Sequence, residues 1–211
     1  KIIEAKGKPV TPGLISPISN IGVVEINALD VTNDDSPDFF GPGFSVFNAF
    51  NPHSTLIPWN RSNGVTSSIS TPGYSSQIFK GMGSFYLLDG DIDITGNADV
   101  AMYARLGAIG GSRAETIQIM ESMFELALNK DELELEELLG TTFASSMDMQ
   151  LQDIQALSRV VNREIPLVLE VNRAIDILQA LRLKNDYDLE LVLMSVEEAP
   201  LVLDQILASG V

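Results

Sequence analysis

The C-terminal third of the chain alternates short apolar runs with stretches of helical period. Pro166–Val171 (P-L-V-L-E-V) is nearly continuous in apolar residues, which is typical of a strand in a parallel sheet covered on both faces. Ala174–Lys184 has the apolar spacing of a helix, and Glu190–Met194 (E-L-V-L-M) is a second apolar run. Glu197–Ser209 is helical again, and Gly210 ends it. This order predicts right-handed βαβ units on a parallel sheet.

The middle of the chain also has a helical period. Ser112 and Glu115 have the spacing of a capping box, which marks the start of a helix. Apolar residues then recur at helical intervals, at Ile117, Met120, Phe124 and Ala127. We predict two more helices, an acidic one over Asp131–Leu139 that ends at Gly140, and one over Met147–Asn162 that buries its apolar face.

The first part of the chain is divided by turn residues. Pro12 and Gly13 make a sharp turn, after which Leu14 and Ile15 begin an apolar run that we predict to be a buried strand. Asp30–Pro42 is acidic and interrupted by prolines, so it is predicted to be a loop.

A second helix–strand pair follows. Ser54–Asn63 is predicted to be a short helix that Gly64 ends, and Val65–Ser70 alternates as a strand does. Gly81–Asp91 (G-M-G-S-F-Y-L-L-D-G-D) is interpreted as a glycine-rich turn, a short apolar strand and another turn. Its lone Gly-x-Gly is too short for a dinucleotide-binding motif.

Composition narrows the possible partners. The chain has 211 residues, of which 45% are hydrophobic, and 29 acidic against 13 basic residues give a net charge of −16. Nucleic acid is therefore excluded as a predicted partner, because phosphate binding needs a basic face, and anionic membranes would repel the chain. No apolar run reaches the roughly eighteen residues that a membrane span needs. The absence of cysteine excludes disulfides, thiolate catalysis and cysteine-based zinc sites.

Three blocks of the sequence resemble one known family. Gly7–Ile15 (G-K-P-V-T-P-G-L-I) is similar to the segment that leads into the barrel of the metal-dependent amidohydrolases, which include the imidazolonepropionases. Pro166–Ile177 resembles a later strand of that barrel. A further set matches the family at many fixed spacings: Asn51-Pro52, Ser54, Leu56-Ile57-Pro58, Arg61 and Asn63–Thr66. The resemblance is good over Ile2–Ser70 and Glu164–Val211 and weaker between them.

The resemblance implies an α/β fold, part of a (β/α)₈ TIM barrel of amidohydrolase type with parallel strands. Residues 1–9 would be the end of a strand and turn from the accompanying N-terminal β-sandwich, and residues 10–211 the first part of the barrel. A complete barrel usually needs about 250 residues. Lys1 is not a methionine, and we predict that a new strand starts at Val211, so we expect a fragment of a longer protein.

The resemblance also implies where a metal site would lie. The family's Asp-x-His-x-His motif falls on Ser16, Ile18 and Asn20, and its later histidine ligands fall on Glu170 and Ser195. The family would use zinc, but of the four histidine positions only Glu170 could bind a metal well. A catalytic zinc needs about three protein ligands. We therefore predict no metal site and no cofactor, with Ile18, Asn20, Glu170 and Ser195 as the positions that line the former site.

Two residues are weak catalytic candidates in their own right. His53 is the only histidine, and Asn-Pro-His-Ser before a helix is more simply a capping turn. Glu170 lies inside an apolar strand, so its carboxylate must be exposed, paired or shifted in pKa. Arg173, three residues on, is a candidate partner, and structural pairing is favoured over an acid–base role.

These observations leave three hypotheses open. The leading one is a degenerate amidohydrolase domain that acts as a binding or structural protein, with a small-molecule ligand as its partner. The second is an active amidohydrolase with a relocated or metal-free site, in which Glu170, Asn20 and His53 are the first candidates. The third is a half-barrel without activity of its own, whose open edges would contact a second copy or the rest of its own chain. Related chains often carry export signals, so the resemblance implies the periplasm or the cell exterior.

Overall fold

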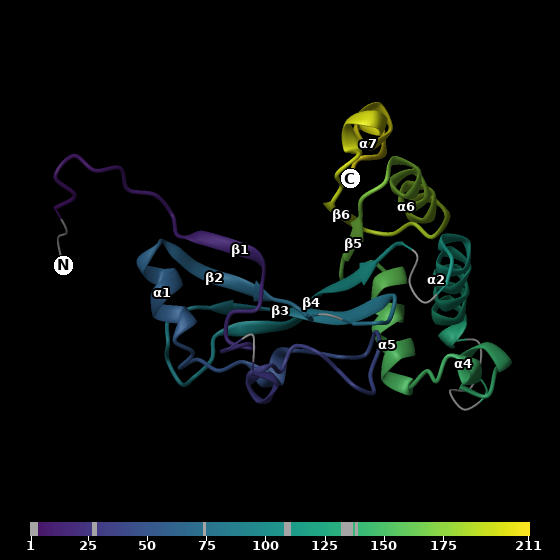
Figure 1. The fold of residues 1–211 in the computed structure, drawn as a ribbon, viewed down its shortest axis with the longest axis horizontal. Helices are drawn as coiled ribbons and strands as arrows, with labels where there is room; N and C mark the ends of the chain where they lie inside the picture. The colour runs from purple at the N-terminus through teal and green to yellow at the C-terminus, as the bar shows by residue number, and fades with distance from the viewer. Residues whose placement is uncertain (1–3, 27–28, 74, 108–110, 132–136, 138) are drawn as a thin grey trace.

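A six-stranded sheet in the order β1-β2-β3-β4-β5-β6 organises the computed structural model (Figure 1). The structure describes residues 4–26, 29–73, 75–107, 111–131, 137 and 139–211. The strands are β1 (Leu14–Ser19), β2 (Val65–Ser70), β3 (Phe79–Leu87), β4 (Gly96–Arg105), β5 (Leu167–Val171) and β6 (Leu191–Ser195). The β1–β2, β4–β5 and β5–β6 pairings are parallel, whereas β3 runs antiparallel to both its neighbours. The expectation of parallel strands is therefore wrong for β3.

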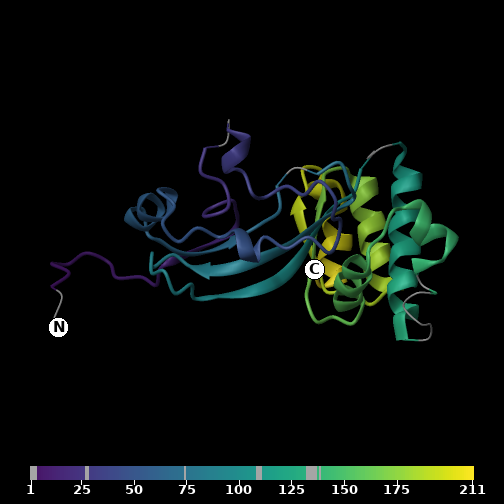
Figure 2. The same cartoon turned by 90° about the horizontal axis from the view of Figure 1, so that it is seen from below.

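The helices gather mainly around one end of this sheet (Figures 1 and 2). They are α1 (Leu56–Ser62), α2 (Arg113–Leu128), α4 (Thr142–Ser146), α5 (Leu151–Val161), α6 (Ala174–Asp186) and α7 (Leu203–Ser209). Short 3-10 turns lie at Asp30–Thr32, Phe47–Ala49, Asn129–Asp131 and Ala199–Val202. Within the described residues, no helix combines the length and the apolar character needed to cross a bilayer.

The secondary structure predicted for the C-terminal half is largely confirmed. In β5 and β6 the apolar runs form parallel strands, and α6 connects them. Ser112 caps α2 by accepting a hydrogen bond from the Glu115 amide. The helix predicted over Glu197–Ser209 begins instead with a 3-10 turn at Ala199–Val202, and α7 ends at Gly210 with a φ of 68°. The predicted helix over Asp131–Leu139 lies mostly outside the described residues.

The large core lies between one face of the sheet and the helices. Alternation along the strands decides which residues enter it: Met102 and Ala104 of β4, like Leu167 and Leu169 of β5, pack with the helices. From the helices, the core receives Met120, Phe124, Ile154, Leu157, Ile177 and Leu181. The predicted periodicity of α2 and α5 thus identifies the buried faces of both helices.

The N-terminal part confirms some predictions and corrects others. The helix α1, the glycine that follows it (Gly64, φ 90°) and β2 form as expected. The prediction of a turn at the start of the glycine-rich segment is wrong, because β3 continues through Gly81 and Gly83. Gly81 has a φ of 119°, and a Cβ there would lie 2.7 Å from the Phe44 carbonyl oxygen, so glycine serves close packing here rather than chain reversal.

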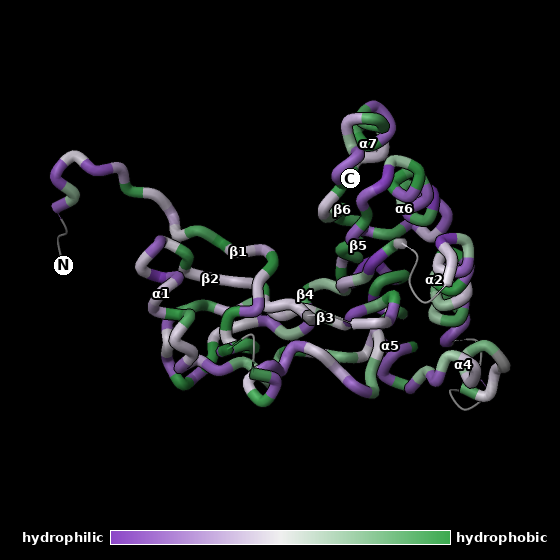
Figure 3. The backbone as a smooth tube through the Cα atoms, viewed as in Figure 1, coloured by the Kyte–Doolittle hydropathy of each residue, from purple (hydrophilic) through white to green (hydrophobic). Residues whose placement is uncertain are grey.

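The predicted burial of β1 is also wrong. Figure 3 shows apolar positions in β1, but Leu14 and Ile15 are 60% and 62% exposed. β1 is an edge strand of the sheet, and the described helices α2, α5 and α6 pack around the strands at the other end. The β-sandwich remnant expected over residues 1–9 is not seen in residues 4–9, which form no strand.

The face of the sheet opposite the large core is curled and carries a small apolar cluster. Ala101 and Tyr103 of β4 pack with Val168, and Ile69 and Met194 join them. The Tyr103 hydroxyl donates a 3.4 Å hydrogen bond to the Pro17 carbonyl oxygen in β1, three strands away. Such a contact requires the sheet to bend toward itself, as a partial barrel does.

Tyr103 should make the chain sensitive to alkali. Burial raises the pKa of Tyr103 from 10.0 to about 12. The neutral phenol therefore stabilises the folded state fully below pH 10, and this contribution is lost as the pH rises through 12, because the unfolded chain releases its proton first. We expect a loss of roughly 2 kcal/mol in the free energy of unfolding over this range, measured by urea titration. Tyr103→Phe should reduce this loss, and an equal loss in both proteins would contradict the assignment.

Candidate functional site

A pocket of about 350 Å³ lies where β4 and β5 end. Arg105 is the last residue of β4, and it pairs in register with Glu170 of β5. Both strands are parallel, so their carboxyl ends open on the same edge of the sheet, where α/β folds usually place ligands. The pocket is lined by Arg105, Leu106, Gly107, Arg113, Glu170, Asn172, Arg173 and Asp176.

Glu170 is held in this pocket by a lysine from a third strand. Lys80 Nζ lies 2.8 Å from Glu170 Oε2, and the two side chains are 15% and 26% exposed. Lys80 lies at an irregularity of β3, where the register with β4 shifts between Phe79 and Gly81. The expected pairing of Glu170 is thus present, but its partner is Lys80 and not the predicted Arg173.

The start of α6 forms the second wall of the pocket. Asp176, in the first turn of α6, is 5% exposed, and its Oδ2 accepts a 2.9 Å hydrogen bond from Arg113 Nε at the start of α2. Asn172 follows β5, and its buried Oδ1 has no hydrogen-bond partner among the described residues. Arg173 is the N-cap residue of α6 and is exposed.

The charge of this pocket differs from that of the whole chain. Its lining includes the three arginines Arg105, Arg113 and Arg173 against two carboxylates, whereas the chain has a net charge of −16. Glu170 is already paired with Lys80 and Asp176 with Arg113. Arginines in a partly enclosed site are suited to bind carboxylates or other planar anions.

The other predicted site residues lie elsewhere. Ile18 in β1 is 45% exposed, and Asn20 follows β1 in a turn where its carbonyl oxygen accepts from the amides of Val23 and Val24. Ser195 ends β6 in an exposed position with a φ of 73°. None of these residues lines the pocket that contains Glu170.

His53 lies in the turn before α1, and it is exposed. Its backbone N–H donates to Asn51 Oδ1 at 3.0 Å, which is the capping turn that the sequence favours. In both views α1 lies at the end of the sheet away from β5 (Figures 1 and 2). The structure therefore does not bring Glu170, Asn20 and His53 together in one pocket.

The described part of the chain offers few side chains that are grouped as metal ligands are. Across those residues, no group of three or more histidine, aspartate or glutamate side chains is placed to hold a metal ion. At the strand ends, the carboxylate of Glu170 already faces an ammonium group.

Sequence reasoning missed most of this pocket. Arg105 belongs to β4, a strand that the pattern did not predict, and Lys80 is 90 positions away from Glu170 in sequence. One signal was available: Asn172, Arg173 and Asp176 follow a predicted parallel strand and begin a predicted helix, where ligand-binding residues often lie.

Comparisons with known proteins support the fold. No family model matches the chain, and no curated protein matches it. A solved structure described as an amidohydrolase from Thermotoga maritima MSB8 superposes with a TM-score of 0.71 at 22% sequence identity. The match covers 94% of this chain and 57% of that chain, so this chain spans a little over half the length of its structural neighbour. The chain therefore has an amidohydrolase-like fold, in the form of a curled, six-stranded half-barrel sheet with its helices.

Proposed function

We propose that this chain is an amidohydrolase-type domain, related to the imidazolonepropionases, that has lost the metal site and binds a small carboxylate at the ends of β4 and β5. The domain would begin near residue 10. The observation that carries the proposal is the ion pair of 2.8 Å between Lys80 and Glu170 inside an arginine-lined pocket.

The ion pair argues against metal binding at this point. Glu170 is the one position among the four histidine equivalents that could still bind a metal well. A divalent cation at its carboxylate would have to displace the Lys80 ammonium and would be repelled by it. Ile18, Asn20 and Ser195 do not line the same pocket, so they add no ligands to Glu170.

The arginines set the class of ligand. Arg113 is already bound to Asp176, and the proposal places the incoming carboxylate on the exposed Arg173, with Arg105 lining the same pocket. A planar guanidinium can donate two parallel hydrogen bonds to a carboxylate, which gives orientation as well as affinity. The Asn172 side chain adds an amide at the same wall, suited to a polar group of the ligand.

A matched pair of probes tests the proposal. We expect N-acetylglycinate to bind in a one-to-one complex by calorimetry at low salt, and the neutral N-acetylglycinamide to bind at least about tenfold more weakly. Arg173→Gln should weaken the binding of N-acetylglycinate by a similar factor. Arg163→Gln is the control, because Arg163 pairs with Asp188 and does not line this pocket.

Two outcomes would overturn the proposal. Equal affinities for N-acetylglycinate and N-acetylglycinamide would show that the pocket does not recognise a carboxylate. Zinc retained near one per chain after dialysis, measured by elemental mass spectrometry, would support instead the alternative of an active amidohydrolase with a relocated site. In that case, loss of hydrolysis after chelation would identify the metal as catalytic.

A further inference from the structure

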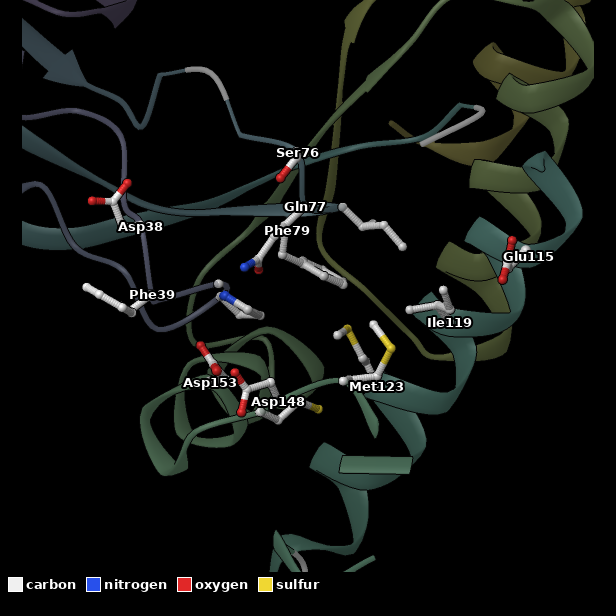
Figure 4. A pocket seen from close by; sticks show the side chains of 15 residues that line it. Asp38, Phe39, Ser76, Gln77, Phe79, Glu115, Ile119, Met123, Asp148 and Asp153 are labelled. Atoms are coloured by element: carbon white, nitrogen blue, oxygen red, sulfur yellow. The ribbon is translucent and has the colours of Figure 1, made fainter. Parts of the chain in front are cut away.

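A second cavity, of about 370 Å³, lies away from the strand-end pocket (Figure 4). Its walls come from four stretches of the chain: the loop at Asp38–Pro42, the residues that lead into β3, α2, and the segment that leads into α5. It shares no lining residue with the strand-end pocket. Cavities of roughly 300–1,000 Å³ are the usual size for small-molecule sites.

The inner walls of this cavity are apolar and buried. Phe79 and Met123 are 1% and 6% exposed, and Met149 is 7% exposed. Ile119 of α2 lines the same wall, and in Figure 4 its side chain lies beside that of Met123. Methionine side chains adapt to irregular ligands, and aromatic rings offer a face to cations.

Carboxylates lie around the apolar walls, and none of the described residues that line them is basic. Asp38, Glu115 and Asp148 are exposed lining residues from three different segments. Asp153 adds a fourth carboxylate that is only 3% exposed, and both its oxygens accept backbone hydrogen bonds of 2.8 Å, from Gly43 and Gln150. The cavity therefore combines an apolar interior with a negative rim.

The loop wall of this cavity is packed firmly against its neighbours. A Cβ at Gly43 would lie 2.8 Å from the carbonyl carbon of Gln152, at the start of α5. Real Cβ atoms do not approach backbone so closely, so Gly43 lets the loop lie directly on the start of α5. A preformed wall reduces the entropy that a ligand must overcome on binding.

We propose that this cavity binds a small organic cation with an apolar body, namely an arylalkyl- or alkylammonium. The apolar part of the ligand lies against Phe79, Ile119 and Met123, where it is removed from water. The ammonium lies at the rim beside Asp148, whose carboxylate attracts it. An anion of the same shape meets only like charge here, and a bare metal ion gains nothing from the apolar walls.

Three probes of nearly equal shape test the inference: phenethylammonium, the neutral 2-phenylethanol, and 3-phenylpropionate. We expect saturable one-to-one binding of the ammonium by calorimetry and by shifts of methionine methyl signals in NMR spectra. The alcohol should bind about tenfold more weakly, and the anion more weakly still. Added salt should reduce the advantage of the ammonium over the alcohol.

Variants of the lining residues test whether the ammonium binds in this cavity. Ile119→Trp should fill it and abolish binding, while Asp148→Asn should reduce ammonium binding several-fold and leave the alcohol unchanged. Asp204→Asn in α7 is the matched control, because it removes the same charge at an exposed position outside the cavity. Equal effects of the two aspartate substitutions, or equal affinity for the ammonium and the alcohol, would overturn the proposal. The carboxylate site is tested with separate probes, so either site can fail alone.

Discussion

Asp153→Ala is expected to lower the free energy of unfolding by about 3–4 kcal/mol, because two hydrogen bonds to a buried carboxylate disappear at once. One Asp153 oxygen accepts from the Gly43 amide, 110 residues away, and the other accepts from the Gln150 amide in the capping box of α5. Alanine leaves both N–H groups without these acceptors and weakens the start of the helix. Urea unfolding followed by circular dichroism measures the loss.

Two controls separate the hydrogen bonds from the charge. Asp153→Asn keeps one side-chain oxygen as an acceptor, so it should lower the free energy of unfolding by only about half as much as Asp153→Ala. Asp148→Asn removes an exposed charge from the segment just before α5, keeps a residue that tolerates the φ of 53° there, and should change stability by less than about 0.5 kcal/mol. If Asp153→Ala and Asp148→Asn cost the same, the link between the Gly43 loop and α5 does not stabilise the fold.

This link also illustrates what the sequence pattern could not predict. The pattern predicts α5 well, because Ile154, Leu157 and Val161 recur at helical spacing and are buried. It says nothing about Gly43, since a hydrogen bond between a loop and a helix 110 residues later leaves no periodic trace. Local periodicity reports which face of an element is buried, and not which distant backbone its polar side chains bind.

The errors in the sheet have a similar cause. β4 was not predicted, and it begins G-N-A-D before its buried stretch, so only part of it has the apolar character of a strand. The glycines in β3 suggested a turn, but they are needed where Phe44 and Tyr103 pack closely against the strand. Glycine in a strand has the same sequence signature as glycine in a turn, and only the tertiary neighbours distinguish the two uses.

Of the four positions predicted to lie together at the strand ends, only Glu170 lines the candidate pocket. Ile18, Asn20 and Ser195 do not line it. The arginines and Lys80 were missed, because the resemblance directs attention to the positions of the family's metal ligands. Lys80, Arg105 and Arg113 come from β3, β4 and α2, in the part of the chain where the resemblance is weaker.

Lys80→Met should destabilise the chain by about 3 kcal/mol, because it leaves the Glu170 carboxylate without its cation in a partly buried site. The Lys80 side chain is 15% exposed and that of Glu170 26%, so solvent screens the pair in part and the loss should fall at the lower end of the range for buried pairs. Chemical denaturation at pH 7 gives the size of the effect.

The double variant Lys80→Met/Glu170→Leu decides whether the pair is retained for stability. Replacing both charges with apolar groups removes the desolvation cost along with the attraction, so most of the stability should return. Carboxylate binding should then fall, because Glu170 lines the pocket and its contact with Lys80 holds that wall in place beside Arg105. Recovered stability with weakened N-acetylglycinate binding assigns the ion pair to the ligand site. Unchanged ligand binding in the recovered variant would instead make Lys80–Glu170 a structural pair alone, and the carboxylate would depend on the arginines of the pocket.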